Sequence, residues 1–169
     1  IGYDALGGSI AGGEKNVAIG NYSLDATTSG DENVALGYNS LTGNITGYNN
    51  TAIGFAAGAV ITTGSQNVLI GYSSDPSANN ASNQIVIGHD ATGHGDNIVV
   101  IGNGSATAIH PHDDDEVDLG SSTYEYKDLY VDGTAYLDSV GFGTTKMALP
   151  TADGSANQVL KTDGSGSLS

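Results

Sequence analysis

The chain has 169 residues and a net charge of −15, with four lysines, no arginine and no cysteine. So acidic a chain excludes sequence-independent binding of nucleic acid, which needs Lys and Arg against phosphate, and the lack of cysteine excludes disulfides and zinc–thiolate sites. No stretch approaches the roughly 18 apolar residues of a membrane span, so we expect no membrane insertion, and no signal peptide is visible.

A short apolar phrase returns along residues 1–106. Asn33-Val-Ala-Leu-Gly37 reappears as Asn50-Thr-Ala-Ile-Gly54, 17 residues later, and seven such units can be counted. A fixed period of this kind indicates a repeat architecture. The chain starts on Ile1-Gly2, the last part of the phrase, so we expect it to be a piece of a longer protein. A turn is assigned to the closing glycine of each later phrase: Gly20, Gly37, Gly54, Gly71, Gly88 and Gly102.

Each phrase predicts a short strand, because β-branched residues dominate it and turn residues bracket it. An asparagine precedes most of these strands, and amides stacked about 4.8 Å apart would form a hydrogen-bonded ladder. Three positions after each glycine stands Ala or Ser, which favours close packing at a corner. Strand, corner and loop together predict one coil of a parallel β-solenoid, in which neighbouring coils share a narrow core.

Side chains alternate along a strand, so each phrase has two faces. We assign the first and third residues to the coil core: Val17, Ile19, Val34, Leu36, Ile53, Val68, Ile70, Ile85, Ile87 and Ile101. The middle residues then form a second apolar row that a lone solenoid would expose: Ala18, Ala35, Ala52, Leu69, Val86 and Val100. An exposed apolar stripe favours a partner, and we expect this row to be the seam of a homotrimer.

The phrase N-[VT]-x-[IL]-G-x-x-[SA] resembles the head repeat of trimeric autotransporter adhesins of the YadA type. It is even more similar to the NTAIGYxAL repeats of phage tail fibres. The resemblance covers residues 1–106 and implies a left-handed parallel β-roll whose three chains pack along a common axis. The period of 17 residues is longer than in those relatives, so we expect longer loops.

Beyond the repeats, residues 107–148 predict a β-rich neck. Two strands joined by a turn at Asp132-Gly133 are expected within residues 124–143. The DLGS…YKDLY segment of residues 118–130 resembles a phage tail-fibre motif. Residues 149–169 are expected to begin a distal stem, with a strand candidate at 158–161.

His110-Pro-His112 is the sharpest candidate for a ligand site. Residues i and i+2 of a strand share a face, and three chains would bring their histidines together on the axis, in a set that suits a divalent metal. The alternative is a solvated linker stiffened by Pro111. The acidic run of residues 113–116 lacks the spacing of a calcium loop, and a solvated junction is favoured there. No other cofactor is expected.

An aromatic residue follows the repeat glycine at Tyr3, Tyr38, Phe55 and Tyr72. Such a row suits stacking on sugars, but we favour a stack that joins one coil to the next. The glycine-rich run at 102–108 lacks the lysine of a phosphate loop, and no signature of a nucleophilic triad occurs. The sequence therefore predicts no enzyme.

These patterns predict an all-β fold: a left-handed parallel β-solenoid of about seven 17-residue coils, homotrimeric, followed by a β-rich neck. The predicted function is structural and adhesive, in a phage tail fibre used for host attachment, located on the virion or at a cell surface. The alternatives are a bacterial trimeric autotransporter adhesin, a purely mechanical shaft and, from another class, a glycan-degrading tailspike, which the small periodic loops disfavour. The expected partners are further copies of the chain, adjoining fibre segments and a host receptor or glycan.

Overall fold

The computed structural model describes residues 1–8, 12–112, 118–135, 139–142 and 145–148. It divides into two units, Ile1–His110 and Pro111–Ser169, and each is described by itself. The division lies close to residue 106, where we expect the repeats to end. The described residues contain no helix, and therefore none of the length and hydropathy that crossing a membrane would require.

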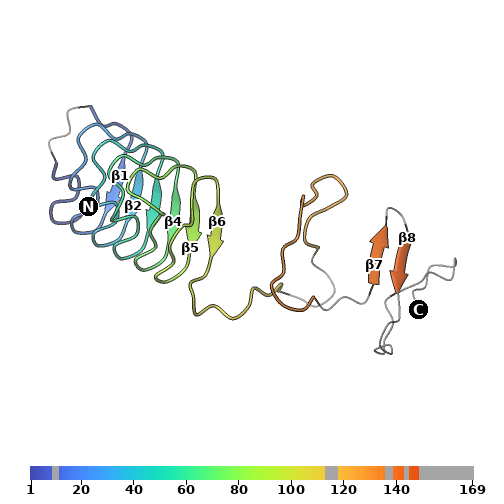
Figure 1. The fold of residues 1–169 in the computed structure, drawn as a ribbon. Helices are drawn as coiled ribbons and strands as arrows, with labels where there is room; N and C mark the ends of the chain where they lie inside the picture. The colour runs from blue at the N-terminus through green and yellow to red at the C-terminus, as the bar shows by residue number, and fades with distance from the viewer. Residues whose placement is uncertain (9–11, 113–117, 136–138, 143–144, 149–169) are drawn as a thin grey trace. The chain divides into compact units, whose positions relative to one another are not determined.

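The first unit is a parallel β-solenoid. Six strands form one sheet in chain order (Figure 1). Partner residues are 17 apart, as in Val17 and Val34, and only 14 apart in the last pair, Ile85 and Val99. The strands are β1 (Val17–Ile19), β2 (Val34–Leu36), β3 (Thr51–Ile53), β4 (Val68–Ile70), β5 (Ile85–Ile87) and β6 (Val99–Ile101).

The predicted all-β parallel solenoid is confirmed, but it has about five turns rather than seven. The count of glycines overstates the number of turns, because Gly2 closes only a fragment of a coil and the chain leaves the sheet after Gly102. The left-handed sense of the coil and the trimer stay predictions.

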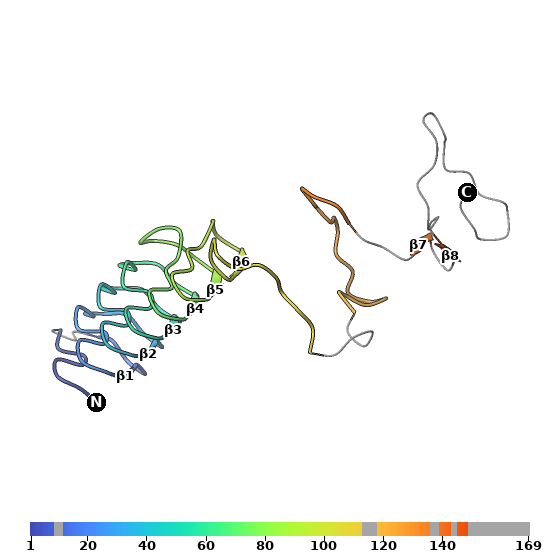
Figure 2. The ribbon, with the colours of Figure 1, turned by 90° about the horizontal axis from the view of Figure 1, so that it is seen from below.

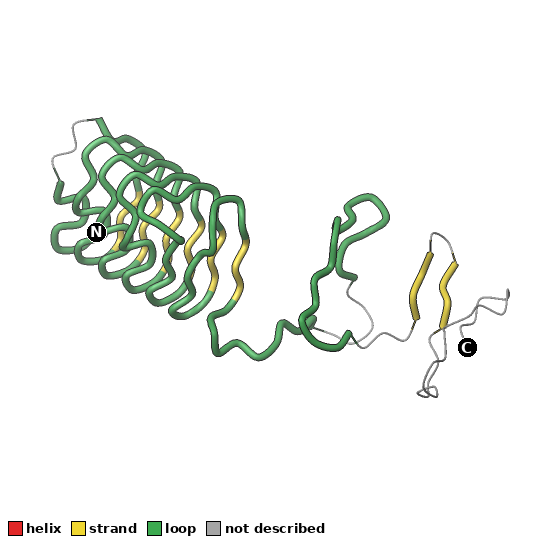
Figure 3. The backbone as a smooth tube through the Cα atoms, viewed as in Figure 1, coloured by secondary structure: helices red, strands yellow, loops and turns green. Residues whose placement is uncertain are grey.

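Each coil contains one short strand, and the rest of the coil is loop (Figure 3). These loops also stack in step from coil to coil (Figure 2). Backbone hydrogen bonds continue around the coil: Leu41 N donates to Ala57 O at 2.9 Å, and Ile45 N donates to Thr62 O at 2.8 Å. Strands of three residues suffice because most of the remaining backbone is also paired with the next coil.

Some corners of the coil are formed by non-glycine residues in the left-handed backbone conformation. The residue before each ladder amide has a positive φ, for example 58° at Glu32 and 64° at Gln66. A second corner contains Asn39 at 56° and Leu41 at 50°. Such a conformation costs a non-glycine residue roughly 1–2 kcal/mol, which the coil-to-coil hydrogen bonds offset. The prediction of turns at glycines missed these corners.

The two faces of each strand are the reverse of the prediction. The middle residues point into the coil: Ala35, Ala52, Leu69 and Val86 are fully buried, Ala18 is 7% exposed, and Val100 is half-buried. The flanking residues predicted as core point outward. Their exposed fractions run from 36% to 54% at Val17, Ile19, Val34, Leu36, Ile53, Ile85, Ile87 and Ile101, and Val68 and Ile70 are half-buried. Val99, which was not assigned to the core, is 59% exposed.

The reason for this reversal is the narrow interior. In two coils the buried Leu24 or Leu41 fills the space beside a strand alanine. In the next coil the strand supplies Leu69, and Gly58 takes the place of the facing leucine. A Cβ on Gly58 would come within 2.8 Å of Leu69 Cδ1. Where a leucine from a loop already fills the interior, two large strand residues would not fit inside.

In the second unit, β7 (Ser139–Phe142) and β8 (Thr145–Ala148) pair antiparallel. The hairpin predicted around Asp132-Gly133 is wrong, because residues 124–135 contain no strand. The alternating apolar side chains of this segment have no sheet to pack against in a single chain. An isolated pair of strands is only marginally stable in water, so the predicted hairpin does not form here. The strand candidate at 158–161 and the predicted stem at 149–169 lie outside the described residues.

Candidate functional site

The outward residues of β1 to β6 make one continuous surface, which we call the outer apolar face. It consists of two rows that run from coil to coil, and Thr51 is the only polar member of the twelve positions. Neighbouring residues in a row lie about 4.8 Å apart. The first row is Val17, Val34, Thr51, Val68, Ile85 and Val99, and the second is Ile19, Leu36, Ile53, Ile70, Ile87 and Ile101.

This surface carries no group that could act in acid–base chemistry or ligate a metal. Its exposed Val, Ile and Leu side chains suit contact with another apolar surface. Contiguous apolar patches of more than a few hundred Å² are rare on monomeric proteins and mark sites of association. The residues predicted as the trimer seam, the row of Ala18, do not reach it, since they lie inside the coil.

A buried amide ladder fixes the strands behind this face. Asn50 Oδ1 accepts from the backbone N of Asn67 at 3.1 Å and from its Nδ2 at 3.0 Å, while Asn50 Nδ2 donates to Gly64 O at 2.8 Å. Asn33 takes part in the same way. The ladder ends at Gln84, whose backbone N donates to Asn67 Oδ1 but whose side chain bonds Ser77 and Asp96 instead. All four side chains are fully buried. The predicted ladder is therefore confirmed.

The ladder also holds the signal that could have predicted the correct face. A ladder amide stands two residues before the middle residue of its strand, so the two share a face. Hydrogen bonds between amides are strongest where water is excluded. Placing Asn50 inside would therefore have placed Ala52 inside too.

An aromatic column stands beside the sheet, one ring to a coil. The rings of Tyr38, Phe55, Tyr72 and His89 stack with centroids 5.0 to 5.2 Å apart and nearly parallel planes. Because each ring covers the face of the next, the column leaves mainly ring edges open. This geometry matches the coil-to-coil stack that we favour, rather than a platform for sugar rings.

Tyr22 is the member of the column that the sequence pattern missed. Asn21 occupies the repeat position in this coil and has no ring. Tyr22, the next residue, places its ring edge-on between Tyr3 at 5.5 Å and Tyr38 at 5.8 Å. The spacing between coils would have indicated a gap here, which a neighbouring tyrosine could fill.

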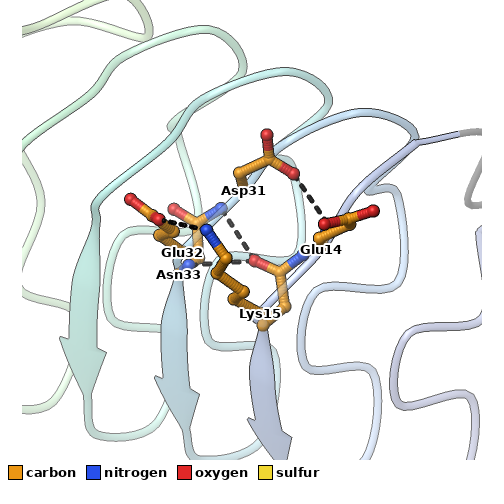
Figure 4. A network of polar contacts seen from close by, with 6 residues as sticks. Glu14, Lys15, Asp31, Glu32 and Asn33 are labelled. Carbon is orange, nitrogen blue, oxygen red and sulfur yellow. Dashed lines mark hydrogen bonds and ion pairs between the residues drawn. The ribbon is translucent and has the colours of Figure 1, made fainter.

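Charged residues meet over the first coils (Figure 4). Lys15 Nζ lies 2.9 Å from Glu32 Oε1, and Glu14 N donates to Asp31 Oδ1 at 2.6 Å. The hydrogen bond to Glu32, together with the attraction between the charges, raises the pKa of Lys15. Both members of the ion pair are largely exposed. This network joins one coil to the next and has no catalytic geometry.

The predicted metal ligands His110 and His112 are exposed and lie on either side of the division between the units. The described part of one chain holds no group of three or more His, Asp or Glu that could bind a metal ion. The metal site requires histidines from three chains and stays a prediction. The acidic run of residues 113–116 lies outside the described residues.

An open pocket of about 390 Å³ adjoins the last coil. Asp90 Oδ2 lies 3.3 Å from Nδ1 of His89, which does not line the pocket. Its lining consists of Asp90, Thr92, His94, Val100, Ile101, Gly102, Asn103 and Gly104.

The fold defines a class of protein: an all-β parallel solenoid, here with one apolar side of its sheet exposed. Comparison with known protein families, with curated proteins and with solved structures found no match. The function is therefore argued from the geometry of the solenoid and from the repeat itself.

Proposed function

We propose that this chain is a structural and adhesive segment of a homotrimeric fibre, of the kind that a phage uses to attach to its host. The observation that carries this proposal is the outer apolar face. Covering apolar surface contributes about 25 cal/mol per Å², so a face of eleven Val, Ile and Leu residues favours association strongly. The proposed seam consists of the rows that begin with Val17 and Ile19.

The regular register supports a fibre rather than a compact assembly. Equivalent residues pair from β1 to β6 without a shift, as Val17 does with Val34. The face therefore continues along the solenoid, and copies can associate along its whole length. Two copies face to face would also cover it, but the likeness of the repeat to trimeric fibres favours three around one axis.

The adhesive part of the proposal concerns the loops away from the sheet. Residues 25–32, 42–49, 59–66 and 75–83 are rich in Thr, Ser, Asn and Gly. Loops held by a rigid scaffold commonly carry binding contacts. A host receptor or surface glycan is the proposed partner for them, and the virion or cell surface is the proposed location.

Light scattering on the full chain tests the trimer. We expect a mass three times that of the 16.9 kDa chain. Ile53→Asp should reduce the mass to that of a monomer, because a carboxylate would be buried in the seam. Ile45→Asp is the matched control: Ile45 is 42% exposed and lies on a loop, whereas Ile53 is 37% exposed and lies on the sheet.

Circular dichroism should show the same β signal for both variants, and Ile87→Asp repeats the test in another coil. A wild-type monomer or dimer would contradict the three-fold proposal. For adhesion, the labelled trimer should bind host cells in competition with the intact particle. A trimer that binds no cells would leave a mechanical shaft.

A further inference from the structure

The chain leaves its last coil through Asn103-Gly104, the only Asn-Gly pair in the sequence. A glycine after asparagine has no side chain to hinder attack by its backbone nitrogen on the asparagine side chain. A Cβ placed on Gly104 would meet nothing within 4 Å, and the residue is exposed. The backbone nitrogen of Gly104 donates no hydrogen bond to any described residue. The nucleophile is therefore free and unhindered.

Both ends of the Asn103 side chain are held in place. Its Oδ1 accepts from the backbone N of Ser105 at 2.9 Å, and its Nδ2 donates to His89 O at 2.6 Å. The Ser105 N–H polarises the side-chain carbonyl. It also lies where it would stabilise negative charge that develops on Oδ1, as a donor in an oxyanion hole does.

We propose that Asn103 is a site of spontaneous modification, in which the chain converts its own amide to an acid. The deprotonated nitrogen of Gly104 attacks Cγ of Asn103, and a new N–C bond forms. The bond from Cγ to Nδ2 breaks, and ammonia leaves with the proton that Gly104 lost. Water then opens the five-membered imide at either carbonyl, which yields aspartate or isoaspartate. No oxidant or cofactor is needed.

The ladder asparagines provide an internal contrast. Asn33, Asn50 and Asn67 are fully buried, and each is followed by Val or Thr. The next backbone nitrogen is already engaged, as when Val34 N donates to Asn50 O at 2.8 Å. Their Cγ atoms are thus shielded from attack, and these three asparagines are expected to convert more slowly than Asn103.

The conversion changes a contact at the end of the aromatic column. Nδ2 of Asn103 is a donor to the carbonyl of His89, the last ring of the column. A carboxylate oxygen in its place cannot donate, so two acceptors would face each other. The modified chain therefore loses the tie between its last coil and the residues that follow.

Peptide mapping by mass spectrometry tests the proposal on the full chain, incubated at mildly alkaline pH. We expect the Asn103 peptide to show the mass of an acid in place of an amide, and isoaspartate, before any other asparagine peptide does. Gly104→Ala should slow this several-fold. Conversion of another asparagine first, or an unchanged rate in Gly104→Ala, would overturn the proposal. Asp132-Gly133 can form the same ring, but without a change in mass.

A second pair of variants tests the role assigned to the Ser105 N–H. Ser105→Pro removes this donor, since proline has no backbone N–H, whereas Ser105→Ala keeps it. Conversion should be slower in the proline variant and unchanged in the alanine variant, with the circular dichroism of the solenoid the same in both. Equal rates in the two variants would show that the donor plays no part.

Discussion

The solenoid and residues 118–135 differ in what happens to their large apolar side chains. In the solenoid, Leu24, Leu41 and Leu69 are fully buried within their coils. In residues 118–135, the large apolar side chains are 50% to 90% exposed, and a contact such as Ser121 N to Tyr124 O at 3.0 Å is local. These exposed side chains are Leu119, Tyr124, Tyr126, Leu129, Tyr130 and Val131.

The difference comes from repetition. In a repeat, each residue meets its equivalent in the next coil, so a single chain completes its own interior. Residues 118–135 have no such equivalents, and their apolar side chains find nothing to pack on within the described chain. One chain thus suffices for the inside of the solenoid, but it covers neither the outer apolar face nor this segment. Both surfaces are available for the association of several copies that we propose.

The largest expected effect comes from Gly54→Ala, which places a Cβ against the backbone of the next coil. Gly54 has a φ of 139°, and a Cβ there would fall on the carbonyl of Gly71. The clash is with backbone and cannot be relieved by a change of rotamer. We expect a loss of more than about 4 kcal/mol in the free energy of unfolding, measured by urea denaturation.

The matched control for this variant is Gly133→Ala in the second unit, where a Cβ would meet nothing within 4 Å. It should change the unfolding free energy by less than about 0.5 kcal/mol. Equal effects of the two substitutions would break the contrast between a repeat that is tied from coil to coil and a segment that is not.

Leu69→Ala tests the interior itself. Leu69 is fully buried and fills the space left by Gly58, so truncation leaves a cavity in the coil interior. We expect a loss of about 3 kcal/mol. Leu129→Ala, at a residue that is 71% exposed, should leave the unfolding of the solenoid unchanged. A small effect at Leu69 would mean that the coil interior is loosely packed.

Asn50→Ala should cost less, about 2 kcal/mol. It removes the acceptor for Asn67 and the donor to Gly64 O, and so leaves buried polar groups unpaired. Thr46→Ala, on an exposed loop position, is the control and should be nearly neutral. If Asn50→Ala unfolds no earlier than the control in urea, the ladder contributes nothing to the stability of the solenoid.

The period of the solenoid could be predicted from sequence because repetition is visible in the letters themselves. The phase of the strands could not be predicted from hydrophobicity alone. Val34, Ala35 and Leu36 are all apolar, so burial by size assigned the larger pair to the interior. The structure buries Ala35 instead, because Leu24 and Leu41 from the loops already fill the space. Leu24 and Leu41 lie outside the strands, in loops that the repeated phrase does not include.

The candidate site could be predicted in kind but not in its residues. That one side of the sheet would be apolar and unpaired follows from strands that are apolar at every position but Thr51. Which side remained open depended on contacts between coils, such as the Asn50 amide and the Gly58 gap. The left-handed corners at Glu32 and Leu41 were also beyond reach, because neither residue type favours a positive φ.

The smallest expected effect concerns Asp75, the acidic residue of the solenoid that burial disfavours. Burial raises the pKa of its carboxyl above the usual 3.8, although Val60 N donates to Oδ1 at 3.4 Å. The folded chain therefore keeps this proton at a pH where the unfolded chain has lost it. By linkage, stability falls as pH rises from 3.8 through the raised pKa, and stays lower above it.

Asp75→Asn keeps an oxygen to accept from Val60 and removes the buried charge. The variant should therefore be more stable than the wild type at neutral pH. On acidification the wild type gains stability as Asp75 takes up a proton, and the variant should lack this gain. Urea denaturation over a series of pH values measures both. Asp132→Asn changes the net charge equally in the second unit and controls for general repulsion in a chain of charge −15. If Asp75→Asn were less stable than the wild type at neutral pH, the Asp75 carboxylate would be better solvated than its burial implies. The solenoid would then be open to water at this position, as residues 118–135 are.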